Sequence, residues 1–172
     1  MTAGAVLSAD RVYRYRLWRE WDAALPRACY IMLNPSTADE NADDATIRVC
    51  KGRAMRLGMG GIDVVNLFAL RSTQPSALYD HPAPISHPDE PTRAIDELVE
   101  SATRSMVVIC AWGTHGALRS RGRDVLLDLT RRGIKAHAIK INADGSPAHP
   151  LRISYDEPLK LLTPSRARGG GG

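Results

Sequence analysis

The sequence predicts an α/β fold, a single three-layer domain in which a central, mainly parallel sheet is flanked by helices. Its 172 residues fit one domain, and 44% hydrophobic with 24% charged residues is typical of a chain that buries a core. Short apolar runs alternate with stretches of helical periodicity, which is typical of parallel sheets covered by helices. We expect this domain to span residues 1–163, followed by a disordered Arg- and Gly-rich tail over residues 164–172.

The first expected element is an N-terminal strand or hairpin. Tyr13, Tyr15 and Leu17 alternate with Arg14 and Arg16, which predicts a half-buried strand that is free to form a hairpin with the segment after it. Simple alternation places the arginines on a solvated face. The alternative is that they lie along a phosphate backbone, because arginine recurs here beside aromatic residues.

The next elements are two buried strands with a helix between them. Residues 28–33 form a nearly continuous apolar run that stops at Asn34-Pro35-Ser36, and residues 62–68 form a second run. Asp43-Asp44 is expected to open the intervening helix, and Gly58 to end it. The basic residues of this helix are expected to face outward: Arg48, Lys51, Arg53 and Arg56.

The second half continues the alternation. The proline-rich segment 74–91 is expected to be an irregular surface loop. A helix from about 89 to 104 leads into a strand over 106–111, and a helix over about 118–132 leads into a strand over 136–141.

Composition narrows the functional classes. A net charge of +4 and a pI of about 9.2 favour a polyanionic partner. No apolar run approaches the ~20 residues of a membrane span, and residues 1–10 lack the order of a signal peptide, so we expect a cytoplasmic protein without a membrane partner.

Cofactor and metal motifs are missing from the sequence. Cys29, Cys50 and Cys110 are odd in number and widely spaced, so we expect each to be a buried apolar residue rather than a disulfide or zinc ligand. The sequence has no H-x-x-x-H, P-loop, G-x-S-x-G or G-x-G-x-x-G pattern. This argues against common hydrolases, kinases and dinucleotide enzymes, and we expect neither a cofactor nor a metal.

Three polar side chains, Asn34, Asn66 and His149, are the strongest candidates for a catalytic or binding role. Asn34 follows a buried strand and is held by Pro35, so its amide could orient water, and the hydroxyls of Ser36 and Thr37 could hold a phosphate oxygen. A turn with a helix cap would also explain this segment.

The other two candidates, Asn66 and His149, also lie at or after predicted strands. Asn66 interrupts an apolar run, where its amide could read the edge of a nucleobase or could tie two loops together. His149 lies in a proline-flanked loop and could stabilise a leaving group, or could be a surface histidine.

Five segments carry a resemblance that covers nearly the whole chain. They resemble a family of bacterial and phage proteins known only as domain of unknown function number 1643, and their order is distantly similar to the uracil-DNA glycosylase superfamily. The segments are Tyr13–Trp18, Met32–Asp39, Val64–Arg71, Cys110–Gly113 and His149–Leu151.

The superfamily resemblance implies a uracil-DNA-glycosylase-like fold and a set of roles. Asn34-Pro35 matches the core of a G-x-N-P-G motif without its glycines, and Leu151 replaces a serine of the His-Pro-Ser loop. By this resemblance Asn34 and His149 are catalytic, Asn66 and Trp112 bind the base, and a final group contacts phosphate or DNA. That group comprises Ser36, Thr37, Arg71, Leu151 and Arg152.

The expected function is therefore hydrolysis of the N-glycosidic bond of a damaged or modified base in DNA. One alternative is a hydrolase of free modified nucleosides or nucleotides. Two others are a catalytically inactive nucleic-acid-binding module and a small-molecule-binding α/β domain.

Overall fold

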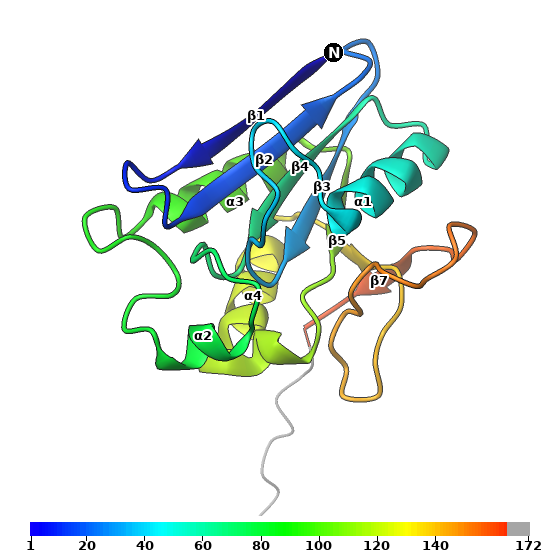
Figure 1. The fold of residues 1–172 in the computed structure, drawn as a ribbon. Coiled ribbons are helices and arrows are strands. Elements are labelled where there is room, and N and C mark those ends of the chain that lie inside the picture. The colour runs from blue at the N-terminus through cyan, green and yellow to red at the C-terminus, as the bar shows by residue number, and fades with distance from the viewer. Residues whose placement is uncertain (165–172) are drawn as a thin grey trace, which may run out of the picture.

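The fold is a seven-stranded sheet with helices on both faces, as seen in a computed structural model that describes residues 1–164 (Figure 1). The strands are β1 (Thr2–Leu7), β2 (Arg14–Glu20), β3 (Arg27–Met32), β4 (Gly61–Asn66), β5 (Val107–Cys110), β6 (Ala136–Ala138) and β7 (Lys160–Leu162). The helices are α1 (Ala45–Arg56), α2 (Ser76–Asp80), α3 (Arg93–Arg104) and α4 (Arg121–Arg131). A 3₁₀ segment, Thr114–Ser120, precedes α4.

The sheet is mixed, so the expectation of a mainly parallel sheet is wrong. Its strand order is β1-β2-β4-β3-β5-β6-β7. The central strands β4, β3, β5 and β6 are parallel, whereas β1, β2 and β7 pair antiparallel with their neighbours. The parallel centre comes from the apolar runs that the sequence displays, and the antiparallel strands extend it at both edges.

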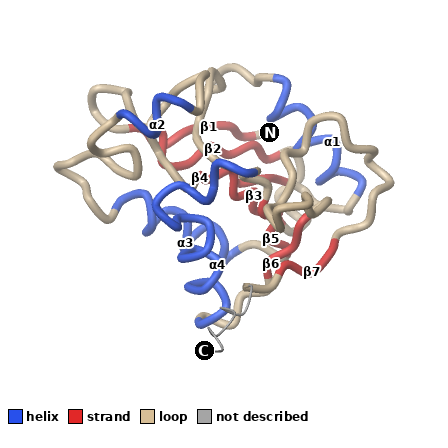
Figure 2. Tube along the Cα trace, turned by 90° about the horizontal axis from the view of Figure 1, so that it is seen from below, coloured by secondary structure: helices blue, strands red, loops and turns tan. Residues whose placement is uncertain are grey.

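The helices form the outer two of three layers. Figure 2 shows α1 on one side of the sheet and α3 and α4 on the other. Two core clusters correspond to these sides: one packs α1 against the sheet through Ile47, Cys50 and Ala54, and the other packs α3 and α4 through residues such as Leu98 and Leu129. The three-layer arrangement agrees with the sequence-based expectation.

The ends of α1 are confirmed. The carboxylate of Asp44 accepts a hydrogen bond from Ile47 N–H at 2.9 Å, which caps the helix, and Gly58 follows its end with a φ of +77°. Arg53 differs from expectation, because it is buried rather than facing outward. The C-terminal loop covers this part of the helix and supplies carbonyl groups to the guanidinium.

The strand β2 departs from simple alternation. It forms its hairpin with β1, the segment before it, and pairs on its other side with β4. In the β1–β2 register Val6 pairs with Arg16 and Leu7 with Arg14, which makes Tyr15 the extra residue of a β-bulge.

The bulge changes which face of the sheet Arg14 occupies. Arg16 forms ion pairs with Asp63 and Glu97 on the α3 side, whereas Arg14 lies on the α1 side and is only 3% exposed. Arg19 is also buried and pairs with Asp43 at 2.7 Å. The expectation of a solvated arginine face is therefore wrong, because loops and helices cover both faces of β2.

A buried carboxylate links three segments on the α3 side. Asp63 is fully buried, and its oxygens lie 3.1 Å from Arg16 Nε, 3.4 Å from Arg27 Nη1 and 3.1 Å from Arg104 Nε. One carboxylate thus joins β2, β3 and α3 to the centre of the sheet.

Other differences lie in connecting segments. The expected irregular loop 74–91 contains the short helix α2, and the last expected helix begins at Arg121, after a 3₁₀ segment. The expected tail lies outside the described residues except for Pro164. Within residues 1–164, no helix has the length and apolar character that crossing a membrane requires.

Candidate functional site

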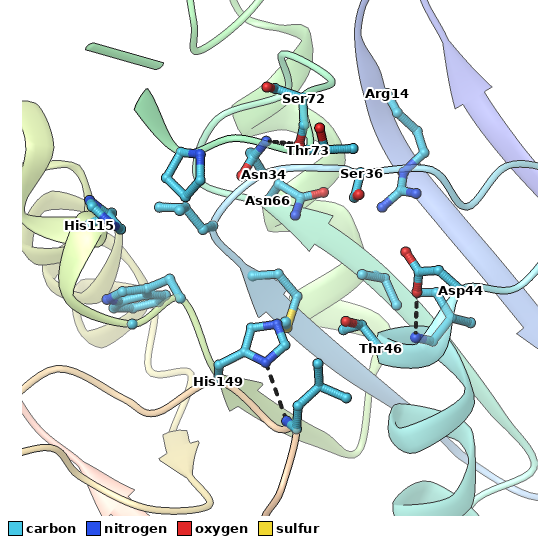
Figure 3. Close-up of a pocket in the computed structure, with 18 of the residues that line it drawn as sticks. Arg14, Asn34, Ser36, Asp44, Thr46, Asn66, Ser72, Thr73, His115 and His149 are labelled. Carbon is cyan, nitrogen blue, oxygen red and sulfur yellow. Dashed lines mark hydrogen bonds between the residues drawn. The ribbon is translucent and has the colours of Figure 1, made fainter. Parts of the chain in front are cut away.

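A cavity of about 370 Å³ opens at the carboxyl ends of β3, β4 and β5, on the α1 side of the sheet (Figure 3). This is where parallel sheets usually bind ligands, because the loops diverge there. Its polar lining comes from six separate segments: Arg14, Asn34 with Ser36, Asp44 with Thr46, Asn66, Ser72 with Thr73, and His149. Trp112, His115 and Leu151 also line it.

Asn66 presents an unsatisfied amide to this cavity. The residue ends β4 and is 3% exposed, and neither Nδ2 nor Oδ1 has a hydrogen-bond partner among the described residues. A buried amide without partners costs about 1–3 kcal/mol for each group left unpaired. The amide therefore has both a donor group, Nδ2, and an acceptor group, Oδ1, that can pair with a ligand of matching polar edge.

Asn34, in contrast, is fixed by the protein. Its Nδ2 donates to the carbonyl oxygen of Ser72 at 2.9 Å (Figure 3). It also lies 3.2 Å from Pro35 O and 3.4 Å from Leu70 O. No group of the described chain donates to Asn34 Oδ1. The amide nitrogen thus holds the side chain in place, and the oxygen is left to accept a hydrogen bond from water or ligand.

His149 faces the same cavity with a defined tautomer. Its Nδ1 accepts a hydrogen bond from Leu151 N–H at 3.2 Å, so the proton of the neutral ring is on Nε2. His149 is an exposed residue, but partial desolvation of its ring lowers the pKa of His149, and the nearby carboxylate of Asp44 opposes this shift only in part. The ring is therefore a neutral hydrogen-bond donor at pH 7.

Arg53, on α1, holds the loop that carries His149 through hydrogen bonds to the loop backbone. The buried guanidinium donates to four carbonyls of that loop, with Ser154 O at 2.7 Å as the shortest contact; the others are Ile153, Tyr155 and Glu157. Gly52 allows the Tyr155 ring to pack on α1, because a Cβ there would lie 2.6 Å from the Tyr155 hydroxyl. Arg53 thus fixes the loop just after His149.

Arg14 contributes a buried positive charge. Its Nη1 donates to Ala38 O at 2.7 Å, but its Nε has no partner within the described part of the chain. Burial lowers the pKa of Arg14 to about 10, so the guanidinium remains charged at neutral pH. Figure 3 shows it pointing toward Ser36.

Trp112 forms an apolar wall. It is 6% exposed, and its indole packs so closely on Gly116 and Gly122 that a Cβ at either position would approach it within 2.8 Å or less. Leu151 lies at the mouth and is partly exposed. The cavity therefore combines a flat apolar surface with convergent polar groups.

Six of the nine site residues expected from sequence line this cavity: Asn34, Ser36, Asn66, Trp112, His149 and Leu151. Three do not. Thr37 is exposed, Arg71 donates to Arg11 O at 3.2 Å, and Arg152 is an exposed residue with a φ of +65°. The structure brings the first group together, while their chemical roles stay predictions.

Several lining residues were not singled out from the sequence as cavity groups. In the sequence, Asp44 is explained by its position at the start of a helix, and nothing near His115 marks it as a site residue. In the structure His115 Nδ1 lies 2.9 Å from the Tyr79 hydroxyl. Thr46, Ser72 and Thr73 carry no motif. The position of Asp44 at the start of α1, facing the strand ends, was the only usable signal.

The described residues contain neither a reactive cysteine nor a cluster of metal ligands. All three cysteines are free and buried, and burial raises the pKa of each thiol. Within residues 1–164 no group of three or more His, Cys, Asp or Glu side chains is arranged to hold a metal ion.

Comparison with known proteins identifies one family. The model of a family described as "Protein of unknown function (DUF1643)" matches residues 14–151, which include all the residues that line the cavity. No curated protein and no solved structure matches the chain.

Proposed function

The chain belongs to the DUF1643 family, and we propose that it hydrolyses the N-glycosidic bond of a damaged or modified base in DNA. One observation carries this proposal: Asn34, Asn66 and His149, far apart in sequence, face one cavity at the carboxyl edge of the sheet. The order of these residues, which resembles that of the uracil-DNA glycosylase superfamily, supports a fold and chemistry of that type.

The reaction places opposite charges on the two sides of the breaking bond. Positive charge grows on the sugar, and the departing base takes the electron pair of the C–N bond. Water then adds to the sugar carbon and loses its proton to the surrounding water, from which the released base anion takes up a proton. Because the sugar centre is strongly electrophilic, Asn34 Oδ1 needs only to orient that water, and its three carbonyl contacts hold it for this role.

His149 acts on the base. Its Nε2–H donates a hydrogen bond toward the negative charge that develops on the leaving group. The ring is neutral, so it stabilises the anion as a hydrogen-bond donor and does not transfer a proton to it. The Leu151 N–H contact to Nδ1 and the Arg53 anchor keep the donor aimed.

Asn66 reads the base. A nucleobase edge offers adjacent donor and acceptor groups, and these pair with the amide that has no partner in the protein. The base stacks against the Trp112 side of the cavity. An analogue without the matching edge leaves the amide buried and unpaired, which gives discrimination.

A base in a duplex must first be extruded, which costs a few kcal/mol. Leu151 lies at the mouth of the cavity, and Arg152 follows it in an exposed loop. In this proposal Leu151 fills the space left in the stack, and Arg152 contacts the phosphate backbone.

The test is a panel of duplex and single-stranded oligonucleotides that carry damaged and phage-type modified bases. Alkaline cleavage after incubation reveals abasic sites. We expect base release from at least one member, with a reduction of about 10²-fold or more for Asn34→Ala and His149→Ala, since each removes an oriented polar group. Asn41→Ala and His87→Ala, which lie outside the cavity, are the matched controls.

Other results would redirect or refute the proposal. Release from free modified nucleosides but not from oligonucleotides, independent of salt, would assign the chemistry to free nucleotides. Duplex binding that survives both cavity variants, without abasic product from any base, would show that the chain is a binding module.

A further inference from the structure

We propose that the cavity contains a second subsite, centred on Arg14 and Ser36, that binds an anionic oxygen group of the substrate. This deepens the proposed function, and it rests on that function for the rest of the substrate. The anion is either a phosphate attached to the sugar or an acidic substituent on the base. Both present the same oxygen chemistry to a guanidinium.

The first argument is that Arg14 has unused donors in a buried place. The residue is 3% exposed, yet the contact from Nη1 to Ala38 O is the only hydrogen bond of its guanidinium in the described structure, and Nε has none. No carboxylate oxygen of residues 1–164 lies within 4.0 Å of its guanidinium. A buried charge is normally paired, so this arginine lacks the partner that a ligand would supply.

The second argument is that the backbone aims Arg14 at the cavity. Without the bulge at Tyr15, Arg14 would share the face of Arg16, which lies on the α3 side of the sheet and away from the cavity. The bulge reverses the side and directs the guanidinium between the ends of β4 and α1. Bulges next to active sites often re-aim a side chain in this way.

Nearby carboxylates do not replace the missing partner. The carboxylate of Asp44 caps α1 through Ile47 N–H, and that of Asp39 accepts hydrogen bonds from Asn41 N–H and Ala42 N–H. The negative charges of both carboxylates favour the charged form of Arg14, and the positive charges of Arg19 and Arg71 disfavour it. Arg14 Nε therefore has no hydrogen-bond partner among the described residues.

Ser36 completes the subsite. It lines the cavity beside the guanidinium (Figure 3), and its hydroxyl makes no hydrogen bond within the described chain. An oxygen held between Arg14 Nε and Ser36 Oγ belongs to the same ligand whose base edge meets Asn66, because one cavity of about 370 Å³ contains all three residues.

The direct test observes the Arg14 Nε–H group by ¹H–¹⁵N NMR while inorganic phosphate is added to the full chain. The resonance is assigned by through-bond correlation to the backbone amide of Arg14, and its loss in Arg14→Lys is a check on that assignment. We expect a saturable shift in the wild-type protein that Ser36→Ala weakens and that Arg132→Lys, at an exposed arginine that caps the end of α4 outside the cavity, leaves unchanged. An Nε–H resonance that does not respond to phosphate overturns the subsite, even if Arg14→Lys does not fold.

The second test identifies the source of the anion by calorimetry with 2′-deoxyuridine, its 5′-monophosphate and 5-carboxy-2′-deoxyuridine. We expect one charged compound to bind at least about tenfold more tightly than the parent, as charge-assisted hydrogen bonds provide. Arg14→Gln should abolish this gain, and Arg132→Gln, outside the cavity, should keep it. A gain for the monophosphate identifies a sugar phosphate, and a gain for the carboxy compound identifies a base substituent.

Failures of the two proposals are distinguishable. A phosphate-responsive Arg14 without base release from any substrate leaves the anion subsite and removes the glycosidic reaction. Base release with equal affinity for charged and uncharged compounds, and no phosphate response, removes only the subsite.

Discussion

Replacing Asn66 with leucine should stabilise the folded protein and abolish its function. The amide is 3% exposed, and its nitrogen and oxygen both lack partners in the described chain. Each unpaired group costs about 1–3 kcal/mol, and a leucine of similar size removes both costs, so we expect a gain of about 2 kcal/mol in the free energy of unfolding. For a domain of this length that corresponds to a melting temperature higher by about 4–8 °C.

The measurement is urea unfolding followed by tryptophan fluorescence, with base release or ligand binding measured on the same samples. Asn34→Leu is the matched control, because the amide of Asn34 is paired with three carbonyls. That variant should lose about 1–3 kcal/mol, since the carbonyls lose their donor. Both variants should be inactive, with stability changes of opposite sign.

The reasoning is refuted if Asn66→Leu loses 1 kcal/mol or more of stability. Such a loss would mean that the amide is satisfied in the free protein, so that its donor and acceptor are not reserved for a ligand. Increased stability with undiminished binding would equally exclude Asn66 from substrate recognition.

Three further predictions concern groups around the site. Arg53→Met should lower the free energy of unfolding by about 3 kcal/mol, because four carbonyls lose a buried cationic donor; hydrogen exchange should accelerate in residues 149–157. Partial desolvation lowers the folded-state pKa of His149 below the unfolded value of about 6.5, so its stabilisation is complete above pH 6.5 and is lost as pH falls through the lower folded value. The melting temperature should therefore fall more steeply between pH 7 and 5 in wild type than in His149→Gln, and equal slopes would contradict this. Asp63→Asn should cost about 3 kcal/mol in urea unfolding, since three arginines lose a buried counter-ion. Asp128→Asn, at an exposed pair, should change stability by less than about 1 kcal/mol.

The central part of the fold could be predicted because its signals are local. The apolar runs that became β3 and β4 are buried on both faces, and α1 begins and ends at the expected capping residues. Parallel pairing then places the residues after β3 and β4 at one edge of the sheet. This is why Asn34 and Asn66 could be assigned to a common edge from sequence alone.

The edges of the sheet could not be predicted in the same way. The strand β1 is made mainly of small residues, and its Gly4 is needed because a Cβ would lie 2.2 Å from the Trp18 ring. The strand β7 has only three residues. Both depend on a partner strand rather than on a periodic pattern of their own.

Arg14 shows why part of the site was hidden. A bulge depends on pairing between strands, so the sequence of β2 alone predicts uniform alternation and a solvated arginine. Arg53 was hidden for a similar reason, because its partners lie about 100 residues away in the C-terminal loop. The environment of each arginine is thus set by segments distant in sequence, which supply carbonyl partners to Arg53 and leave Arg14 Nε without a partner.

The hydrogen bonds around the cavity divide its polar groups into two kinds. Asn34 and Arg53 use protein carbonyls, and their contacts position other parts of the site. Asn66 and Arg14 are each 3% exposed and line the cavity, and both keep donors without partners among the described residues, which costs folding free energy. A ligand that satisfies both recovers that free energy on binding, so it should recognise the folded protein through the same groups that destabilise it when empty. The unpaired groups, more than the size of the cavity, therefore define the chemistry that a substrate must bring.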